Sequence, residues 1–504
     1  MDRNSIGNII GVSSMARTSR LMTQRQTILT GLILVILSFQ ALVLVILALF
    51  PYIPDLGLSN LNMSIYTFLV PLSTVFLLGL LYAWLIKLGI REARRYSTKF
   101  NRFFQLMAEP FRQLRSFARA SSLPDRTQTR NILSRPRVML GISVAASIFL
   151  GIVAYRPDIN PSGSLVGIDT PLYALWVGQM LQRPVLGAIE YAFVQASDGS
   201  RPLSLLFPYA TSRLFGASAD FGMRVYPIFL GPLLAISAFV FVARGQGDER
   251  KAAFASLMTS LSFQITIGLW AGFYANWLAL AEAYFLLSAI LNFSKSNSRS
   301  SLFVALLLSL AILFTHPWTW DFMIVLCALF LFRQSLANRD VRIARLAIVF
   351  LTVNVLIDIV RFYALNASGT GIAGLDTITK GVDLSQVVLF WPNVVVTLVQ
   401  YYAQLMAESV VLGLAMIAIW RLVSVREGFS RLLVLWVILG SLPFPFLPSL
   451  LQARIVYLLP IPILASAGAI GLQRLGQNAM QKSLILLLVL LLSANYAISA
   501  VLSL

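Results

Sequence analysis

The sequence predicts an all-α polytopic membrane protein with about 13 transmembrane helices. Of its 504 residues, 58% are hydrophobic and only 12% are charged, and the mean hydropathy is +0.80. A soluble chain of this length could not cover its surface with so few polar side chains. Apolar runs long enough to cross a membrane recur along the chain, and basic residues gather in alternate connections between them. These three observations define the fold class.

The apolar runs place the individual spans. A span needs about 20 apolar residues. The first run follows a basic N-terminus, is too long for a signal-peptide core and lacks a small-residue cleavage site, so we expect an uncleaved helix. The expected spans lie near 28–50, 63–88, 138–155, 222–243, 252–270, 273–293, 301–315, 320–333, 344–364, 400–420, 431–447, 454–473 and 483–503.

A basic segment, 91–137, separates the second span from the third. Its apolar residues recur at spacings of three and four, with arginines between them, which predicts an amphipathic helix. Such a helix fits the anionic cytoplasmic leaflet of a membrane. A surface for a specific protein partner is the alternative.

The basic residues behind the net charge of +19 are distributed over several connections between spans and do not form one patch. The N-terminus and the connections 89–137, 243–251, 294–300, 333–345, 421–431 and 473–482 are all basic, whereas the intervening connections are poor in Lys and Arg. The positive-inside rule then predicts a multi-pass plasma-membrane protein with a cytoplasmic N-terminus and an outer C-terminus. Membrane lipids, and not nucleic acid, are the partners that this distribution indicates.

Two long connections face outside in this topology. The segment 156–221 contains several prolines, yet 171–182, 185–195 and 203–215 have amphipathic helical patterns. They predict an outer loop of short interfacial helices above a membrane cavity. The segment 365–399 is glycine-rich at its start and forms the second outer loop.

Three stretches together resemble a known superfamily. They read GIDTPLYALWVGQML (167–181), RPLSLLFPYATSRLFGASADFGMRVYPIFLGPLLAISAFVF (201–241) and ARIVYLLPIPILASAGAIGL (453–472). Their order and outer location resemble the GT-C-fold membrane glycosyltransferases, which include protein mannosyltransferases, aminoarabinose transferases and oligosaccharyltransferases. The resemblance implies a GT-C-like core over 138–473, preceded by a two-helix extension (1–90) and the basic segment (91–137), and followed by a C-terminal helix (474–504).

The resemblance implies transfer of a sugar from a polyprenyl-phosphate carrier to an acceptor on the outer face, with Asp169 as the catalytic carboxylate. An inverting transfer needs a base for the acceptor proton, and a half-dry interface raises the proton affinity of an acid. Many members carry a second acid beside the first, whereas Thr170 follows here. The alternative role for Asp169 is a helix N-cap before Pro171.

Further candidates lie at the outer ends of spans. Arg454 suits a lipid phosphate because a guanidinium binds phosphate with two parallel hydrogen bonds, while Arg224 could equally be an interfacial arginine. Asp358 and Arg361 stand three residues apart and can pair on one helix face. An ionisable residue within a span, Glu282, indicates function by default. The candidate donor-binding residues are Arg454, Arg224, His316, Tyr173, Arg361 and Glu282.

No metal is required by any motif in the sequence. A divalent ion is a possible cofactor, with Asp169, Asp220 and His316 as candidate ligands. Nucleotide-binding motifs are absent from the sequence, which disfavours nucleotide-dependent chemistry. A lipid-linked sugar fits better than a nucleotide sugar, because the predicted site faces outside, away from nucleotide pools. The acceptor is not determined.

Two rival functions remain open. A lipid or small-molecule transporter or flippase would need charged residues along a path through the bilayer, whereas the candidates gather at one face and only Glu282 lies deeper. A non-catalytic GT-C-like assembly partner is the other, because the second acid is missing.

Overall fold

The structure, a computed structural model, describes residues 135–296, 298–338, 340–364, 393, 397, 409–422, 425, 427–473 and 479–502. The expected spans at 28–50 and 63–88, nearly all of the basic segment 91–137, and most of the outer loop 365–399 lie outside the described residues. Within these ranges the chain is helical, and no strand occurs.

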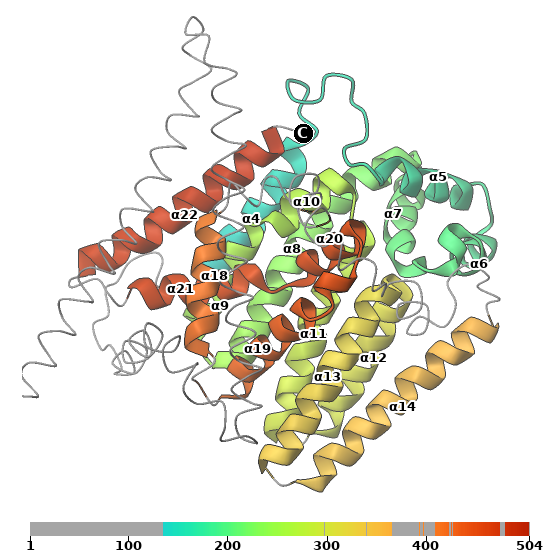
Figure 1. Ribbon diagram of the computed structural model, residues 1–504. Coiled ribbons are helices and arrows are strands. Elements are labelled where there is room, and N and C mark those ends of the chain that lie inside the picture. Colours follow the sequence, from blue (N-terminus) through green and yellow to red (C-terminus); the bar gives the residue numbers. More distant parts are fainter. Residues whose placement is uncertain are drawn as a thin grey trace, which may run out of the picture.

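The described α-helices form one bundle (Figure 1). They are α4 (Pro136–Val153), α5 (Thr170–Leu181), α6 (Val185–Val194), α7 (Pro202–Phe215), α8 (Ala219–Gln246), α9 (Glu249–Ser260), α10 (Phe263–Ala271), α11 (Tyr274–Ser296), α12 (Arg299–Thr315), α13 (Pro317–Asn338), α14 (Val341–Ala364), α18 (Ser409–Leu422), α19 (Gly428–Ser441), α20 (Ser449–Leu458), α21 (Ile461–Gln473) and α22 (Ala479–Leu502).

Seven helical stretches in the described part of the chain are long and apolar enough to cross a membrane, or eight if the bent pair α20–α21 is one span. This confirms the all-α polytopic class. The expected total of about 13 spans is not confirmed, since α12 and α19 have 17 and 14 residues and fall short of a full span by length.

Two expected spans contain an irregularity. The first, 252–270, still lies within one membrane-capable stretch, Glu249–Ala271, whereas the second is a sharply bent pair. The run 252–270 is interrupted after α9, where the Ser262 hydroxyl caps α10 by accepting from the Gln264 backbone N–H. The run 454–473 bends by 45° between α20 and α21. Pro460 lies at this bend and has no N–H to continue the helix. Hydropathy alone averages over such breaks, so both runs had been predicted as single helices.

Helices α5, α6 and α7 confirm the three helices predicted within the outer segment. They lie together at one end of the bundle, beside the segment that follows α4 (Figure 1). The connections α8–α9, α11–α12 and α13–α14 lie at the other end and are the basic ones. The basic connections and the three short helices thus lie at opposite ends of the bundle, as the charge pattern predicted. The identity of the membrane and its two sides stays a prediction.

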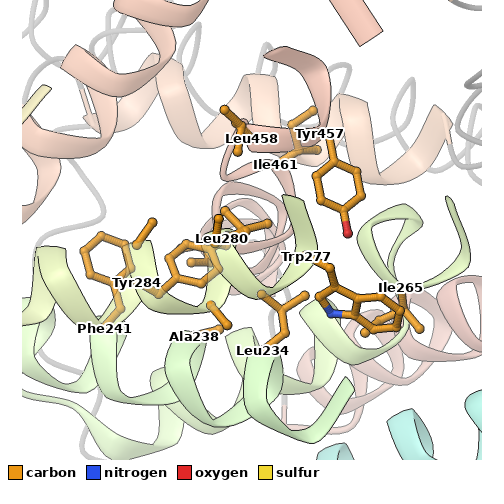
Figure 2. Packing of buried hydrophobic residues seen from close by; sticks show 14 of the residues in the cluster. Leu234, Ala238, Phe241, Ile265, Trp277, Leu280, Tyr284, Tyr457, Leu458 and Ile461 are labelled. Atoms are coloured by element: carbon orange, nitrogen blue, oxygen red, sulfur yellow. The ribbon is translucent and has the colours of Figure 1, made fainter. Parts of the chain in front are cut away.

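Aromatic and aliphatic side chains fill the centre of the bundle between α8 and α11. Phe241 stacks on Tyr284 with ring centroids 5.5 Å apart, and Trp277 packs at the other side of this cluster, beside Ile265 (Figure 2). All three side chains are fully buried. Within a bilayer such contacts stabilise through packing rather than through exclusion of water, because lipid tails are as apolar as the side chains.

Candidate functional site

Asp169 is held in place by its backbone, at the end of α10. Ile168 and Asp169 donate backbone N–H groups to the carbonyls of Trp270 and Ala271, both at 3.1 Å. Gly167 adopts φ +106°, and a Cβ there would lie 2.6 Å from the Leu269 carbonyl oxygen. Only glycine allows this close approach. The loop before α5 is therefore bound to the helix end that precedes α11.

The Asp169 side chain does not cap α5. Asp169 occupies the N-cap position, but its side chain accepts no capping hydrogen bond. Thr170 turns its hydroxyl to the Val166 carbonyl at 2.6 Å instead. The carboxylate is half-buried, and this burial raises its pKa, although the positive charges of Arg201 and Arg454 act in the opposite direction. Asp169 therefore stands at the N-cap position, as the alternative predicted, but its side chain makes no capping hydrogen bond.

Arg201 was missed by the sequence analysis and joins the site from the start of α7. Its Nη1 donates to the Tyr173 hydroxyl at 3.1 Å. Tyr173, which is 1% exposed, packs edge-on against Trp176 and Tyr274 with centroids 5.4 and 5.5 Å apart. The one sequence signal was an arginine before Pro202, at a predicted helix start. Its convergence with Asp169 depends on how α5 and α7 pack.

His316 lies between α12 and α13 and is buried, with 3% exposure. Its Nδ1 accepts the Thr319 backbone N–H at 3.2 Å, and the Thr319 hydroxyl lies 2.8 Å away. A backbone N–H can only donate, so the ring proton belongs on Nε2. Burial, then the charges of Arg201 and Arg454, hold the pKa of His316 well below its usual value. The imidazole is therefore a neutral hydrogen-bond donor.

Arg454, on α20, completes the cluster. Its guanidinium acts electrostatically on both Asp169 and His316, as does that of Arg201. Two guanidiniums therefore act on the same carboxylate and on the same neutral imidazole, and guanidiniums are the side chains that bind phosphate with two parallel hydrogen bonds. Residues from α5, α7, α20 and the α12–α13 turn meet only in the folded chain.

Arg224 and Asp220, both on α8, lie apart from this cluster. The exposed Arg224 guanidinium donates to the Gly163 carbonyl and lies over the Tyr155 ring at 5.8 Å. Asp220 also interacts with Tyr155. Arg224 therefore anchors the segment after α4.

Glu282 on α11 and Arg361 on α14 each have a polar partner. Thr315 donates its hydroxyl to Glu282 Oε1 at 3.1 Å, one residue before His316. Arg361 donates from Nε and Nη2 to Asp358 Oδ1 at 2.9 and 2.8 Å, which confirms the predicted ion pair. Its two side chains are 1% and 2% exposed. Glu282 adjoins the cluster, whereas Arg361 belongs to a separate pair on α14.

A metal centre gains no support from the described side chains. Among them, no group of three or more His, Cys, Asp and Glu residues could hold an ion. Asp169 and His316 share the cluster with two cations, and Asp220 stands apart. Positive neighbours oppose a divalent ion electrostatically. The same neighbours favour an anion.

The fold and the site together define an all-α polytopic membrane protein with a cationic cluster around one carboxylate. No known protein family and no curated protein matches the sequence. A similar solved structure is the apo form of an oligosaccharyltransferase from Archaeoglobus fulgidus, with 12% identity and a TM-score of 0.46. The likeness covers 73% of this chain and 56% of that one, so this chain spans little more than half of that protein.

Proposed function

We propose that the protein is a membrane glycosyltransferase of the GT-C type, which moves a sugar from a polyprenyl-phosphate carrier to an acceptor on the outer face. The observation that carries the proposal is the convergence of Asp169, Arg201 and Arg454. The order of the motifs that resemble GT-C enzymes supports it.

Asp169 is the proposed general base. It takes the proton of the acceptor while the acceptor atom bonds to the anomeric carbon, and the bond from that carbon to the phosphate oxygen breaks. The electron pair leaves with the polyprenyl phosphate. A carboxylate with a raised pKa takes a proton more readily than an ordinary one, which suits a base near neutral pH.

Arg201 and Arg454 are the proposed phosphate ligands, with the Nε2–H of His316 as a third donor. Fixed donors around a leaving phosphate stabilise the charge that grows on it during transfer. Tyr173 positions Arg201 through the hydrogen bond described above. Glu282 and Arg224 are further candidate donor-binding residues, whereas Arg361 is assigned to its buried ion pair with Asp358.

The test is release of polyprenyl phosphate by the purified protein in lipid nanodiscs. Labelled undecaprenyl-phosphate mannose, glucose and arabinose serve as donors, with peptide, lipid and glycan acceptors. Asp169→Asn should lower turnover by roughly 100-fold without loss of donor binding. The matched control is Asp158→Asn, an exposed acid on the same outer segment that pairs with Arg156, and it should keep full activity.

The rival functions give different results in the same assay. A transporter or flippase would move labelled lipid across a liposome membrane without releasing phosphate. A non-catalytic partner would bind the donor and release nothing, and Asp169→Asn would leave that binding unchanged. Absence of turnover with every donor and acceptor pair would exclude the proposed activity for this panel.

A further inference from the structure

Gln264 of α10 and Tyr457 of α20 bind each other in both directions. The Gln264 side-chain amide donates to the carbonyls of Tyr457 and Leu459 at 3.0 and 3.1 Å. In return the Tyr457 hydroxyl donates to the Gln264 carbonyl at 2.7 Å. Both side chains are fully buried. This reciprocal contact joins segments 193 positions apart in the chain.

The contact meets a need created by the bend between α20 and α21. In an unbroken helix the Tyr457 carbonyl would accept the N–H of Ile461. Here that N–H goes to the Leu459 carbonyl at 2.8 Å, so the Tyr457 carbonyl needs another donor. A buried carbonyl without one costs about 1–3 kcal/mol. The Gln264 amide supplies the donor from a neighbouring helix.

Gly268 allows the Tyr457 ring to lie across α10. A Cβ at Gly268 would lie 3.0 Å from the Tyr457 hydroxyl and 2.7 Å from Trp277. Phe273 closes the other side, edge-on, with centroids 5.8 Å apart. Figure 2 shows the Tyr457 hydroxyl directed toward Trp277 and Ile265. The position of α20 against α10 is thus set by packing as well as by hydrogen bonds.

Helix α10 contacts both the loop that carries Asp169 and the helix α20, which carries Arg454. Its C-terminal carbonyls bind the backbone of Asp169, and Gln264 binds α20 one helical turn beyond Arg454. Gln264 and Ala271 are seven residues apart, which is about 10 Å along a helix. A short buried helix therefore links the base to an arginine that acts on it.

We propose that Gln264 and Tyr457 are positioning residues that set the place of Arg454 relative to Asp169. The proposal rests on the proposed function of that pair, in which Arg454 binds the carrier phosphate. Neither residue need touch the substrate. Substitution of Gln264 or Tyr457 would leave Asp169 and Arg454 in the chain but would let α20 shift along α10. Arg454 would then hold the carrier phosphate less tightly and farther from Asp169.

The first measurement reports position. Spin labels at Ile168→Cys and Leu451→Cys, in the full chain with Cys327→Ala, report the distance between the Asp169 loop and α20. Gln264→Met keeps the bulk and removes the donor, and it should broaden this distance distribution. The matched control is Thr266→Val on the same helix, which removes a buried hydrogen bond of 3.0 Å to Tyr496 of α22. It should leave the distribution unchanged.

The second measurement reports phosphate binding, with undecaprenyl phosphate that carries no sugar as the probe in nanodiscs. Gln264→Met should weaken binding about tenfold, and Thr266→Val should not. Tyr457→Phe removes one hydroxyl and should weaken binding about threefold. It provides the test if Gln264→Met does not fold.

The outcomes separate the two proposals. The positioning role is overturned if Gln264→Met and Thr266→Val have the same spin-label distances and the same affinity for undecaprenyl phosphate. If Gln264→Met does not fold, an unchanged affinity for undecaprenyl phosphate in Tyr457→Phe overturns it. If the wild-type protein does not bind the probe, the proposed phosphate site is wrong. In that case the spin-label distances still decide whether Gln264 holds α20 against the Asp169 loop.

Discussion

Arg201 donates from Nη1 to the Tyr173 hydroxyl across 3.1 Å, which joins the start of α7 to the first turn of α5. Asp169, four residues before Tyr173, lies within the field of the same guanidinium. The hydrogen bond holds a long, flexible cation beside the carboxylate. A guanidinium held in this way loses less freedom when it binds a phosphate.

This relationship predicts graded effects at Arg201. Arg201→Ala should weaken binding of undecaprenyl phosphate about tenfold or more, because a fixed cation is lost. Arg201→Lys should keep only part of the wild-type affinity for undecaprenyl phosphate, since an ammonium lacks the paired N–H donors of a guanidinium. The control is Arg183→Ala, an arginine that lies over the Tyr191 ring at 4.3 Å. If Arg183→Ala weakens binding of undecaprenyl phosphate as much as Arg201→Ala does, the loss comes from the lower net positive charge and not from a specific site at Arg201.

A second prediction concerns pH. Burial raises the pKa of Asp169, and a base acts only when it is deprotonated, so turnover should fall as pH drops through that raised pKa. The acid limb of the pH–rate profile should lie above the ordinary aspartate value of about 3.9. Arg454→Gln removes a charge that lowers this pKa and should move the limb to higher pH. A limb that stays in place in Arg454→Gln would contradict the electrostatic coupling.

A third prediction follows from the tautomer of His316. Glutamine places its amide nitrogen near the position of Nε2, and asparagine places it nearer Nδ1. His316→Gln should therefore keep much of the binding of undecaprenyl phosphate, whereas His316→Asn should lose about tenfold. Added chelator should change neither value. Equal losses in both variants, together with wild-type binding that a chelator abolishes and a divalent metal restores, would favour a metal ligand.

A fourth prediction separates Arg361 from the site. The Asp358–Arg361 pair is buried, and Arg361→Met removes a cation that donates two hydrogen bonds to a buried carboxylate. Arg361→Met should lower stability by about 3–5 kcal/mol without changing the donor affinity of the folded fraction. Its control is Arg156→Met in the exposed pair with Asp158, which should cost less than about 1 kcal/mol. Thermal unfolding in detergent measures both. A lower donor affinity at unchanged stability would return Arg361 to the donor site.

Much of this protein could be predicted from the sequence, because hydropathy and local helix signals depend on neighbouring residues. The polytopic class, the three outer helices, the alternation of basic connections and the Asp358–Arg361 pair are all local patterns. Two residues three apart on a helix meet wherever that helix packs. Asp169, His316 and Arg454 could be selected because each is a polar residue at the end of an apolar run.

Only the tertiary structure decided which of these residues meet. Arg201 carries no local signal that distinguishes it from Arg224, yet the packing of α7 against α5 brings Arg201 to Asp169, while α8 turns Arg224 to the Gly163 carbonyl. The breaks at Ser262 and Pro460 were hidden by average hydropathy, and they create the short helices that carry the site. Sequence therefore determined the membrane class and the candidates. The choice among them required contacts between residues far apart in the chain, which no local pattern encodes.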